Sequence, residues 1–209
     1  MSRVIVLATR NPDKARELQW LFAELPVSKV VAADHLGDDV PDVDETGTTL
    51  EENALLKARA LAEFSGELCI ADDTGLEVDA LDGRPGVYAA RYAGPDANYA
   101  DNCDKLVAEL QGVPEAERTA SFRTVMALVD PRGEEGTFER TVDGVLEGRI
   151  LEAPRGDDGF GYDPLFLVPE LGRTLAEVPL EEKNRISHRA RASQAMVELL
   201  RGYLEAVPE

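Results

Sequence analysis

The chain has 209 residues, of which 44% are hydrophobic and 30% charged, and this composition excludes a disordered chain or a disulfide scaffold. Forty-one acidic residues against 22 basic ones give a formal net charge of −19. A surface this negative repels polyanions, so we expect no nucleic-acid partner. A phosphorylated substrate would require a few well-placed bases and a divalent cation to reverse the local sign.

The apolar run over 4–8 is too short for a signal peptide or a membrane span, which predicts a start without a targeting signal. We therefore expect a cytoplasmic protein without a membrane partner. Cys69 and Cys103 have no paired spacing and no neighbouring His, which predicts two free thiols instead of a disulfide or a zinc site.

Extended and helical patterns alternate along the whole chain, and this predicts an α/β fold in one domain over 1–209. Thr49 and Glu52 have the spacing of a capping box at a helix start. In chain order we expect a strand at 4–8, a turn over 9–13 that opens a helix stopped by Pro26, and a strand within 27–32. The middle of the chain predicts a helix from Thr49 to about Phe64, a strand at 68–71 that ends in 72–75, a turn at 82–86 and a helix at about 95–110. The last third predicts a hairpin of 120–129 and 136–150, a strand at 165–167, and a closing helix with Ala192, Met196, Leu199 and Tyr203 on one face.

The first of four polar clusters is Thr9-x-Asn11-x-x-Lys14, which follows a strand and opens a helix. A hydroxyl, an amide, free backbone N–H groups and a cation together suit a phosphate. The alternative is a simple N-cap. Lys14 favours the anion site, because a base in the first turn opposes the helix dipole unless an anion compensates it.

The second cluster is Asp72-Asp73-Thr74-Gly75, directly after an apolar strand. Two adjacent carboxylates repel each other, and a hard cation such as Mg²⁺ would relieve that repulsion. The alternative is an ordinary turn built from Asp and Gly. Asp44 and Glu45 are candidate further ligands, although their spacing alone favours a solvated acidic loop.

The third cluster is Gly159–Asp163, in which glycines on both sides of Phe160 allow a flat ligand to stack on its ring. A β-bulge or tight turn would also explain the glycines. The fourth cluster places Lys183, His188 and Arg189 at the head of the last helix. Three donors there suit an acceptor-rich ligand, whereas a lone helical His is more often surface or core filler.

Several familiar catalytic motifs are missing from the sequence, including the G-x-x-x-x-G-K-[ST] phosphate loop, G-x-G-x-x-G, G-x-S-x-G and H-E-x-x-H. His35 and His188 are its two histidines. A His-rich metal site and a Ser-His-Asp arrangement therefore have little support.

Taken together and in this order, the clusters resemble the Ham1-like, or inosine triphosphate pyrophosphatase, family of house-cleaning nucleotide hydrolases. The resemblance rests on seven segments spread over nearly the whole chain: Thr9–Lys14, Glu45-Thr-Gly47, Glu52-Asn-Ala54 with Lys57, Ala71–Gly75, Gly83–Gly86 with Ala90-Arg-Tyr92, Phe160–Asp163 and Ile186–Arg189. It implies a long mixed β-sheet flanked by helices, in two lobes with a nucleotide cleft between them. It also implies an Mg²⁺-dependent homodimer that splits ITP, dITP and XTP into the monophosphate and pyrophosphate.

The resemblance assigns a role to each matching position. Asp73 corresponds to the catalytic carboxylate and to a metal ligand, with Asp44 as a second ligand. The segments expected to bind the substrate are the triphosphate turn Thr9, Arg10, Asn11, Pro12, Asp13 and Lys14, then Lys57 and Thr74, and finally Phe160, Gly161, Tyr162, Asp163, Lys183, His188 and Arg189, which hold the base.

Two departures from the family pattern concern the acidic residues and the hydroxyl beside them. Asp44 stands where relatives commonly have Glu, and it is one methylene shorter; Thr74 replaces the Ser of many relatives and keeps the hydroxyl. Two other functions stay open at this point. One is a Maf-like hydrolase of altered pyrimidine nucleotides, and the other is a sensor that binds a nucleotide without hydrolysing it.

Overall fold

The computed structural model describes residues 4–9, 18, 22, 29–37, 39–133 and 136–206. Its strands are β1 (Val4–Leu7), β2 (Lys29–Ala32), β3 (Leu68–Val78), β4 (Pro85–Gly86), β5 (Thr119–Asp130), β6 (Phe138–Ile150), β7 (Phe166–Val168) and β8 (Arg173–Thr174). Its α-helices are α2 (Leu50–Ser65), α3 (Tyr99–Glu109), α4 (Leu180–Ile186) and α5 (His188–Ala206), and short 3₁₀ helices lie at Ala33–Leu36, Asp79–Leu81, Ala89–Arg91, Glu115–Glu117 and Leu175–Glu177. None of the helices in these ranges combines the length and the apolar character that crossing a membrane requires.

Hydrogen bonds join the strands into one mixed sheet in the order β2-β1-β3-β5-β6-β7-β8, with β4 paired to β3. Strand β1 runs parallel to β2 and β3, whereas the β3–β4, β6–β7 and β7–β8 pairs are antiparallel. The predicted α/β fold with a mixed sheet and flanking helices is therefore confirmed.

The chain divides into two compact units. The first unit comprises Met1–Asp73, Thr124–Gly144 and Arg189–Glu209, and the second comprises Thr74–Arg123 and Val145–His188. Each long strand, β3, β5 and β6, contributes one part to each unit. Each unit has its own apolar core.

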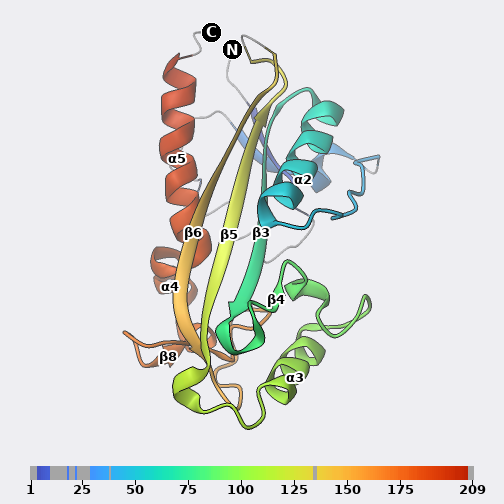
Figure 1. Ribbon diagram of the computed structural model, residues 1–209. Coiled ribbons are helices and arrows are strands. Elements are labelled where there is room, and N and C mark those ends of the chain that lie inside the picture. Colours follow the sequence, from blue (N-terminus) through green and yellow to red (C-terminus); the bar gives the residue numbers. More distant parts are fainter. Residues whose placement is uncertain are drawn as a thin grey trace. The chain divides into compact units, whose positions relative to one another are not determined.

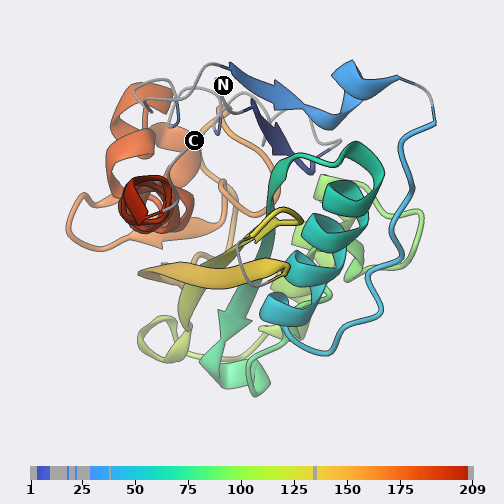
Figure 2. The ribbon, with the colours of Figure 1, turned by 90° about the horizontal axis from the view of Figure 1, so that it is seen from above.

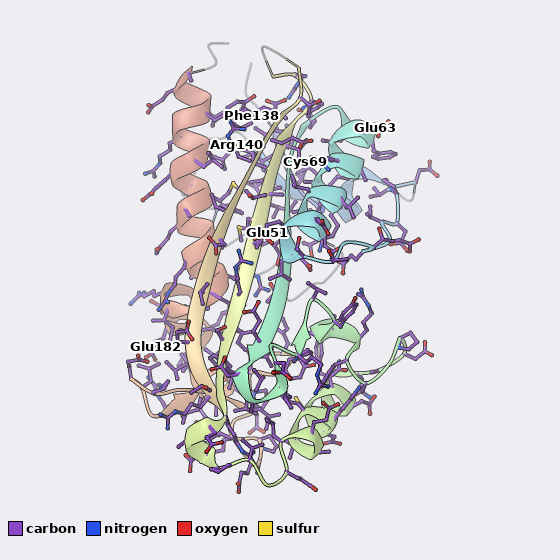
Figure 3. The ribbon with its side chains drawn as sticks, viewed as in Figure 1. Glu51, Glu63, Cys69, Phe138, Arg140 and Glu182 are labelled. Atoms are coloured by element: carbon purple, nitrogen blue, oxygen red, sulfur yellow. The ribbon has the colours of Figure 1, made fainter. Side chains whose placement is uncertain are left out.

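In the first unit, α2 and α5 lie on opposite sides of the strands (Figures 1 and 2). Alternation along β3 explains this arrangement, because successive side chains of a strand point to opposite faces. Leu68 and Ile70 belong to the core cluster that includes Met196 and Leu200 of α5. Cys69, between them in sequence, lies 3.5 Å from the Ser65 hydroxyl of α2 (Figure 3).

The far end of α5 is fixed by aromatic and polar contacts to the same strands. The Tyr203 hydroxyl donates to buried Asp130 at 3.0 Å, and its ring stacks on Phe138 at 4.1 Å between centroids. The Arg140 guanidinium covers the Phe138 ring at 4.9 Å, and Figure 3 labels both residues at the start of β6. These contacts hold the closing helix, predicted from its apolar face, against the sheet.

The second unit is built on a core of aromatic and aliphatic residues in which Phe122 and Phe166 lie 4.6 Å apart. Helix α3 begins at a complete capping box, in which Asn98 and Asp101 exchange hydrogen bonds with each other's backbone N–H. The predicted turn at 82–86 is present, with positive φ at Asp82 and Gly83.

Most predicted elements are confirmed, including both first strands, the helix after Thr49 and the closing helix. Strands β5 and β6, which follow each other in the chain, are neighbours in the sheet as the predicted hairpin requires. Thr49 caps α2 as predicted, and the Glu52 carboxylate accepts from the N–H and the hydroxyl of Thr48. The helix expected before Pro26 lies outside the described residues except for Leu18 and Phe22.

Two expectations about element bounds are wrong. Strand β3 does not end at Ala71 but continues through Asp72–Gly75 to Val78, because the contacts of both carboxylates outweigh the low strand propensity of Asp. Lys183 does not lie at the head of the last helix. It belongs to the short helix α4, and the extended conformation of Ser187 separates α4 from α5.

Candidate functional site

Asp72 and Asp73 are neighbours in sequence, but their side chains point to opposite faces of β3. Asp72 pairs with Arg189 of α5, and Asp73 contacts Asn53 and Lys57 of α2. The two carboxylates therefore need no shared cation to relieve repulsion between them. Each carboxylate has its own basic partner on its own face of the strand.

Asp73 is the centre of a polar cluster in the first unit. Its Oδ1 accepts from the Lys57 ammonium at 3.2 Å, and its Oδ2 accepts from the Asn53 amide at 3.2 Å. The same ammonium donates to Glu45 Oε1 at 2.7 Å. We call Asp73, Lys57, Glu45 and Asn53 the Asp73 cluster.

Lys57 stays charged in this cluster although its side chain is only 14% exposed. Burial lowers the pKa of Lys57, but attraction to Asp73, Glu45 and Asp72 outweighs burial, so its pKa is raised above its ordinary value. A lysine held as a cation beside a carboxylate can neutralise a phosphate oxygen next to the group that handles the proton.

Asn53 of α2 contacts the Glu45–Gly47 segment, and sequence reasoning did not place this residue in the site. The Gly47 N–H donates to Asn53 Oδ1 at 2.8 Å. A Cβ on Gly47 would lie 2.5 Å from that oxygen, so this position requires glycine. An amide on the otherwise apolar face of α2, one helical turn before Lys57, was the available signal.

Thr9 lies at the carboxyl end of β1, as predicted. Leu7 pairs with Ile70 in the parallel β1–β3 ladder, so Thr9 and Asp72 each stand two residues beyond that pair, at the level where β1 ends and β3 continues. This is where open α/β sheets bind ligands. The remaining residues predicted for the triphosphate turn, 10–14, lie outside the described residues. Thr74 is half-buried and follows Asp73 on β3.

Asp44 and Glu45 differ in placement. Asp44 is exposed, whereas Glu45 is half-buried and shares Lys57 with Asp73. Within the part of the chain that the structure describes, no group of three or more His, Cys, Asp or Glu side chains gathers as a metal site would. Two carboxylates and one ammonium give the Asp73 cluster a net negative charge.

Arg189, predicted to contact a substrate base, is almost completely buried. Its Nε lies 3.5 Å from Asp72 Oδ2, and the two side chains are 2% and 1% exposed. The predicted contact therefore stays a prediction, and truncation of Arg189 would also leave Asp72 uncompensated in the interior.

The second unit holds the other predicted segments. Asp163 Oδ2 accepts from the Lys183 ammonium at 2.7 Å and from the Phe160 N–H at 2.9 Å. The same ammonium lies 4.8 Å from the centroid of the Phe160 ring. The centroids of the Tyr99 and Phe160 rings lie 6.0 Å apart. We call Asp163, Lys183 and Phe160 the Asp163 cluster.

The loop that carries Phe160 is a tight turn fixed by its acid. Gly159 has φ +78°, and a Cβ there would meet the Asp163 carboxylate. The Tyr162 hydroxyl donates to Ala89 O at 2.8 Å, and burial raises the pKa of Tyr162. His188 is buried and stacks on Phe122 at 4.7 Å. The structure thus brings together Phe160, Asp163 and Lys183, and places His188 on the aromatic core.

Fold and site together define an α/β protein with a buried carboxylate–lysine pair beside the carboxyl end of a parallel strand, an arrangement suited to a phosphorylated ligand. The chain belongs to the Ham1 family, whose model matches residues 5–199.

Similar proteins cover nearly the whole chain. A Geobacter sulfurreducens protein named dITP/XTP pyrophosphatase is 52% identical over 192 residues, which cover 92% of this chain and 93% of that protein. The structure of a HAM1 protein from Coxiella burnetii has a TM-score of 0.85 and 41% identity, covering 96% of this chain and 99% of that one. A Mycobacterium abscessus structure described as nucleoside-triphosphatase / dITP/XTP pyrophosphatase has a TM-score of 0.73 and 41% identity, covering 92% and 98%.

Proposed function

We propose that this chain hydrolyses the non-canonical purine nucleoside triphosphates ITP, dITP and XTP to the monophosphate and pyrophosphate. The observation that carries the proposal is Asp73 held between Lys57 and Asn53 in a chain 52% identical to a dITP/XTP pyrophosphatase. Names of this kind recur among the relatives and favour purine over pyrimidine substrates.

In this reaction Asp73 is the catalytic base. It orients a water molecule and takes its proton while the water oxygen forms a bond to the α-phosphorus. The bond from that phosphorus to the bridging oxygen breaks, and pyrophosphate leaves with the oxygen. Lys57 offsets negative charge on the phosphate oxygens, and the Thr9–Lys14 segment binds the triphosphate.

The Asp73 cluster fits a magnesium ion by the chemistry of its donors. Oxygens of Asp73 and Glu45 converge on a single ammonium, and hard carboxylate oxygens are the ligands that Mg²⁺ prefers. We assign the ion to Asp73 and Glu45, in place of the exposed Asp44. Bound there, Mg²⁺ would supply charge neutralisation for the phosphates of the substrate.

The Asp163 cluster and its neighbours bind the base in this proposal. Phe160 offers a half-buried ring for stacking, with Gly161, Tyr162, Asp163 and Lys183 around it. Inosine and xanthine carry an O6 acceptor where adenine carries an N6 donor, so donors from His188 and Arg189 would favour the former. The proposed active form is a cytoplasmic homodimer.

A substrate panel tests the function directly. Purified protein is incubated with Mg²⁺ and ITP, dITP, XTP, GTP, ATP or TTP, and pyrophosphate is resolved from orthophosphate. We expect pyrophosphate from ITP, dITP and XTP at a kcat/KM that exceeds that for ATP by roughly 10⁴, and loss of turnover in excess chelator. Equal rates with ATP would contradict the proposal. Binding of ITP without turnover would support a sensor, and preference for altered pyrimidines a Maf-like hydrolase.

A further inference from the structure

Asn53 is a fully buried amide in the first half of α2, whose other buried residues include Ala54, Ala58 and Leu61. A buried amide destabilises a fold unless its donors and its acceptor are hydrogen-bonded, and Asn is also a weak helix former. Helix packing alone therefore favours an aliphatic residue here. The contacts of the side chain give the reason for an amide.

Both ends of the Asn53 amide are occupied, and its orientation follows from its partners. The Gly47 N–H can only donate, so the oxygen Oδ1 faces it at 2.8 Å. The NH₂ group must then face Asp73, whose Oδ2 it contacts at 3.2 Å. One side chain thus joins the Glu45–Gly47 segment to the carboxylate.

The contacts that link Gly47, Asn53 and Asp73 are tightly packed. Gly47 packs so closely that a Cβ would lie 2.5 Å from Asn53 Oδ1 and 2.7 Å from Glu52 Cβ. Lys57, one helical turn further along α2, donates to the other oxygen of Asp73 at 3.2 Å. Two donors from consecutive turns of one helix, one for each oxygen, restrict rotation of the carboxylate.

We propose that Asn53 is the positioning residue for Asp73: it orients the carboxylate toward the attacking water and fixes its place relative to Glu45. This inference rests on the proposed function, because it assigns a role within that reaction. A small misplacement of a reacting group lowers turnover by up to about 10²-fold, so loss of the Asn53 donor is expected to act mainly on kcat.

The chain offers a matched control in Asn102, which is buried in α3 of the second unit. Its Oδ1 also accepts a backbone N–H, from Ala93 at 2.7 Å, but its NH₂ donates to the carbonyl of Ala90 at 3.1 Å. Asn→Asp therefore removes the amide donor, keeps an acceptor and adds a carboxylate at either site. Of the two, only Asn53 donates to Asp73.

The kinetic test compares Asn53→Asp and Asn102→Asp with the wild type on ITP, together with thermal unfolding of all three. We expect Asn53→Asp to lower kcat by about 10- to 100-fold with KM changed by less than about threefold. Asn102→Asp should lower the melting temperature while its kcat stays within about twofold of the wild type. The proposal would be overturned if the folded Asn53→Asp protein had a kcat within about twofold of the wild type, or if its loss of activity came entirely from a raised KM.

A spectroscopic test needs no turnover and covers the case in which Asn53→Asp does not fold. The asparagines of the chain are Asn11, Asn53, Asn98, Asn102 and Asn184, so ¹⁵N-asparagine labelling gives few side-chain signals. We expect Asp73→Ala to shift the Asn53 NH₂ pair and to leave that of Asn102 in place. An unmoved Asn53 pair would overturn the positioning contact. A wild type inactive on ITP would instead overturn the proposed function and leave the contact to be judged by this spectrum.

Discussion

The two units each bury an aspartate–lysine pair, and the pairs differ in charge balance and exposure. In the Asp163 cluster the Lys183 side chain is 4% exposed, donates at 2.7 Å, and shares its acceptor oxygen with a backbone N–H. In the Asp73 cluster Lys57 is 14% exposed and divides its contacts between two acids, at 2.7 and 3.2 Å. The comparison shows that the same residue types form a neutral structural ion pair in the Asp163 cluster and part of a group with net negative charge in the Asp73 cluster.

The difference leads to different consequences for mutation. A neutral, tightly bonded pair fixes the Phe160 loop, and its loss leaves a buried charge without a partner. A cluster with more acid than base, near the end of a parallel strand, can accept a further cation and a water molecule. We therefore expect stability to respond most at Lys183 and turnover to respond most at Lys57 and Asp73.

The largest expected effect on stability is that of Lys183→Met. It leaves the Asp163 carboxylate uncompensated, so the free energy of unfolding should fall by about 3–5 kcal/mol, as measured by urea denaturation. A fall in the free energy of unfolding below about 1 kcal/mol would show that the Asp163 cluster does not stabilise the fold.

Lys57→Met is the counterpart in the first unit. Removal of the cation beside Asp73 should lower kcat/KM on ITP by about 10- to 100-fold, because the phosphate charge is no longer offset. Unfolding free energy should fall by less than it does in Lys183→Met, since the cluster is more exposed. The comparison would be contradicted if Lys57→Met lost more unfolding free energy than Lys183→Met and Lys183→Met lost more kcat/KM than Lys57→Met.

A smaller effect concerns the two free thiols, one in each unit. Burial raises the pKa of Cys69 and that of Cys103 from 9.0 to about 11. Because the folded protein favours the neutral thiol, its contribution to stability is complete below about pH 9 and is lost as the pH rises to about 11. We expect each thiol to account for about 1–2 kcal/mol of this loss.

Urea denaturation at about pH 8 and about pH 10.5 measures the loss, with Cys69→Ala and Cys103→Ala as the informative variants. Each substitution should flatten the alkaline decline by its own share. A decline that stays as steep in the double variant would assign it to other groups.

Local patterns in the sequence predicted much of the fold because local physics determines those features. Thr49 caps its helix through its own side chain, and the apolar face of the closing helix packs where its periodicity places it. Placement of Thr9 at a strand end likewise followed from the apolar run before it.

Features that depend on partners distant in sequence were not predictable in the same way. Asp72 and Asp73 looked like a turn because their partners, Arg189 and Lys57, come from helices on opposite sides of the strand. Asn53 gave a weak signal, since only the fold shows that Gly47 and Asp73 occupy its two ends. The break at Ser187 likewise carried no proline or glycine to mark it.

Asp73→Asn tests the central claim, that the Asp73 cluster is the chemical centre, most directly. The substitution keeps the size of the side chain and removes the base, and the measurement is pyrophosphate release from ITP at saturating substrate. We predict a fall in kcat on the order of a hundredfold or more. The melting temperature should fall as well, because the new NH₂ group faces a donor, either Asn53 or Lys57. Turnover near the wild-type rate in the folded variant would contradict the account.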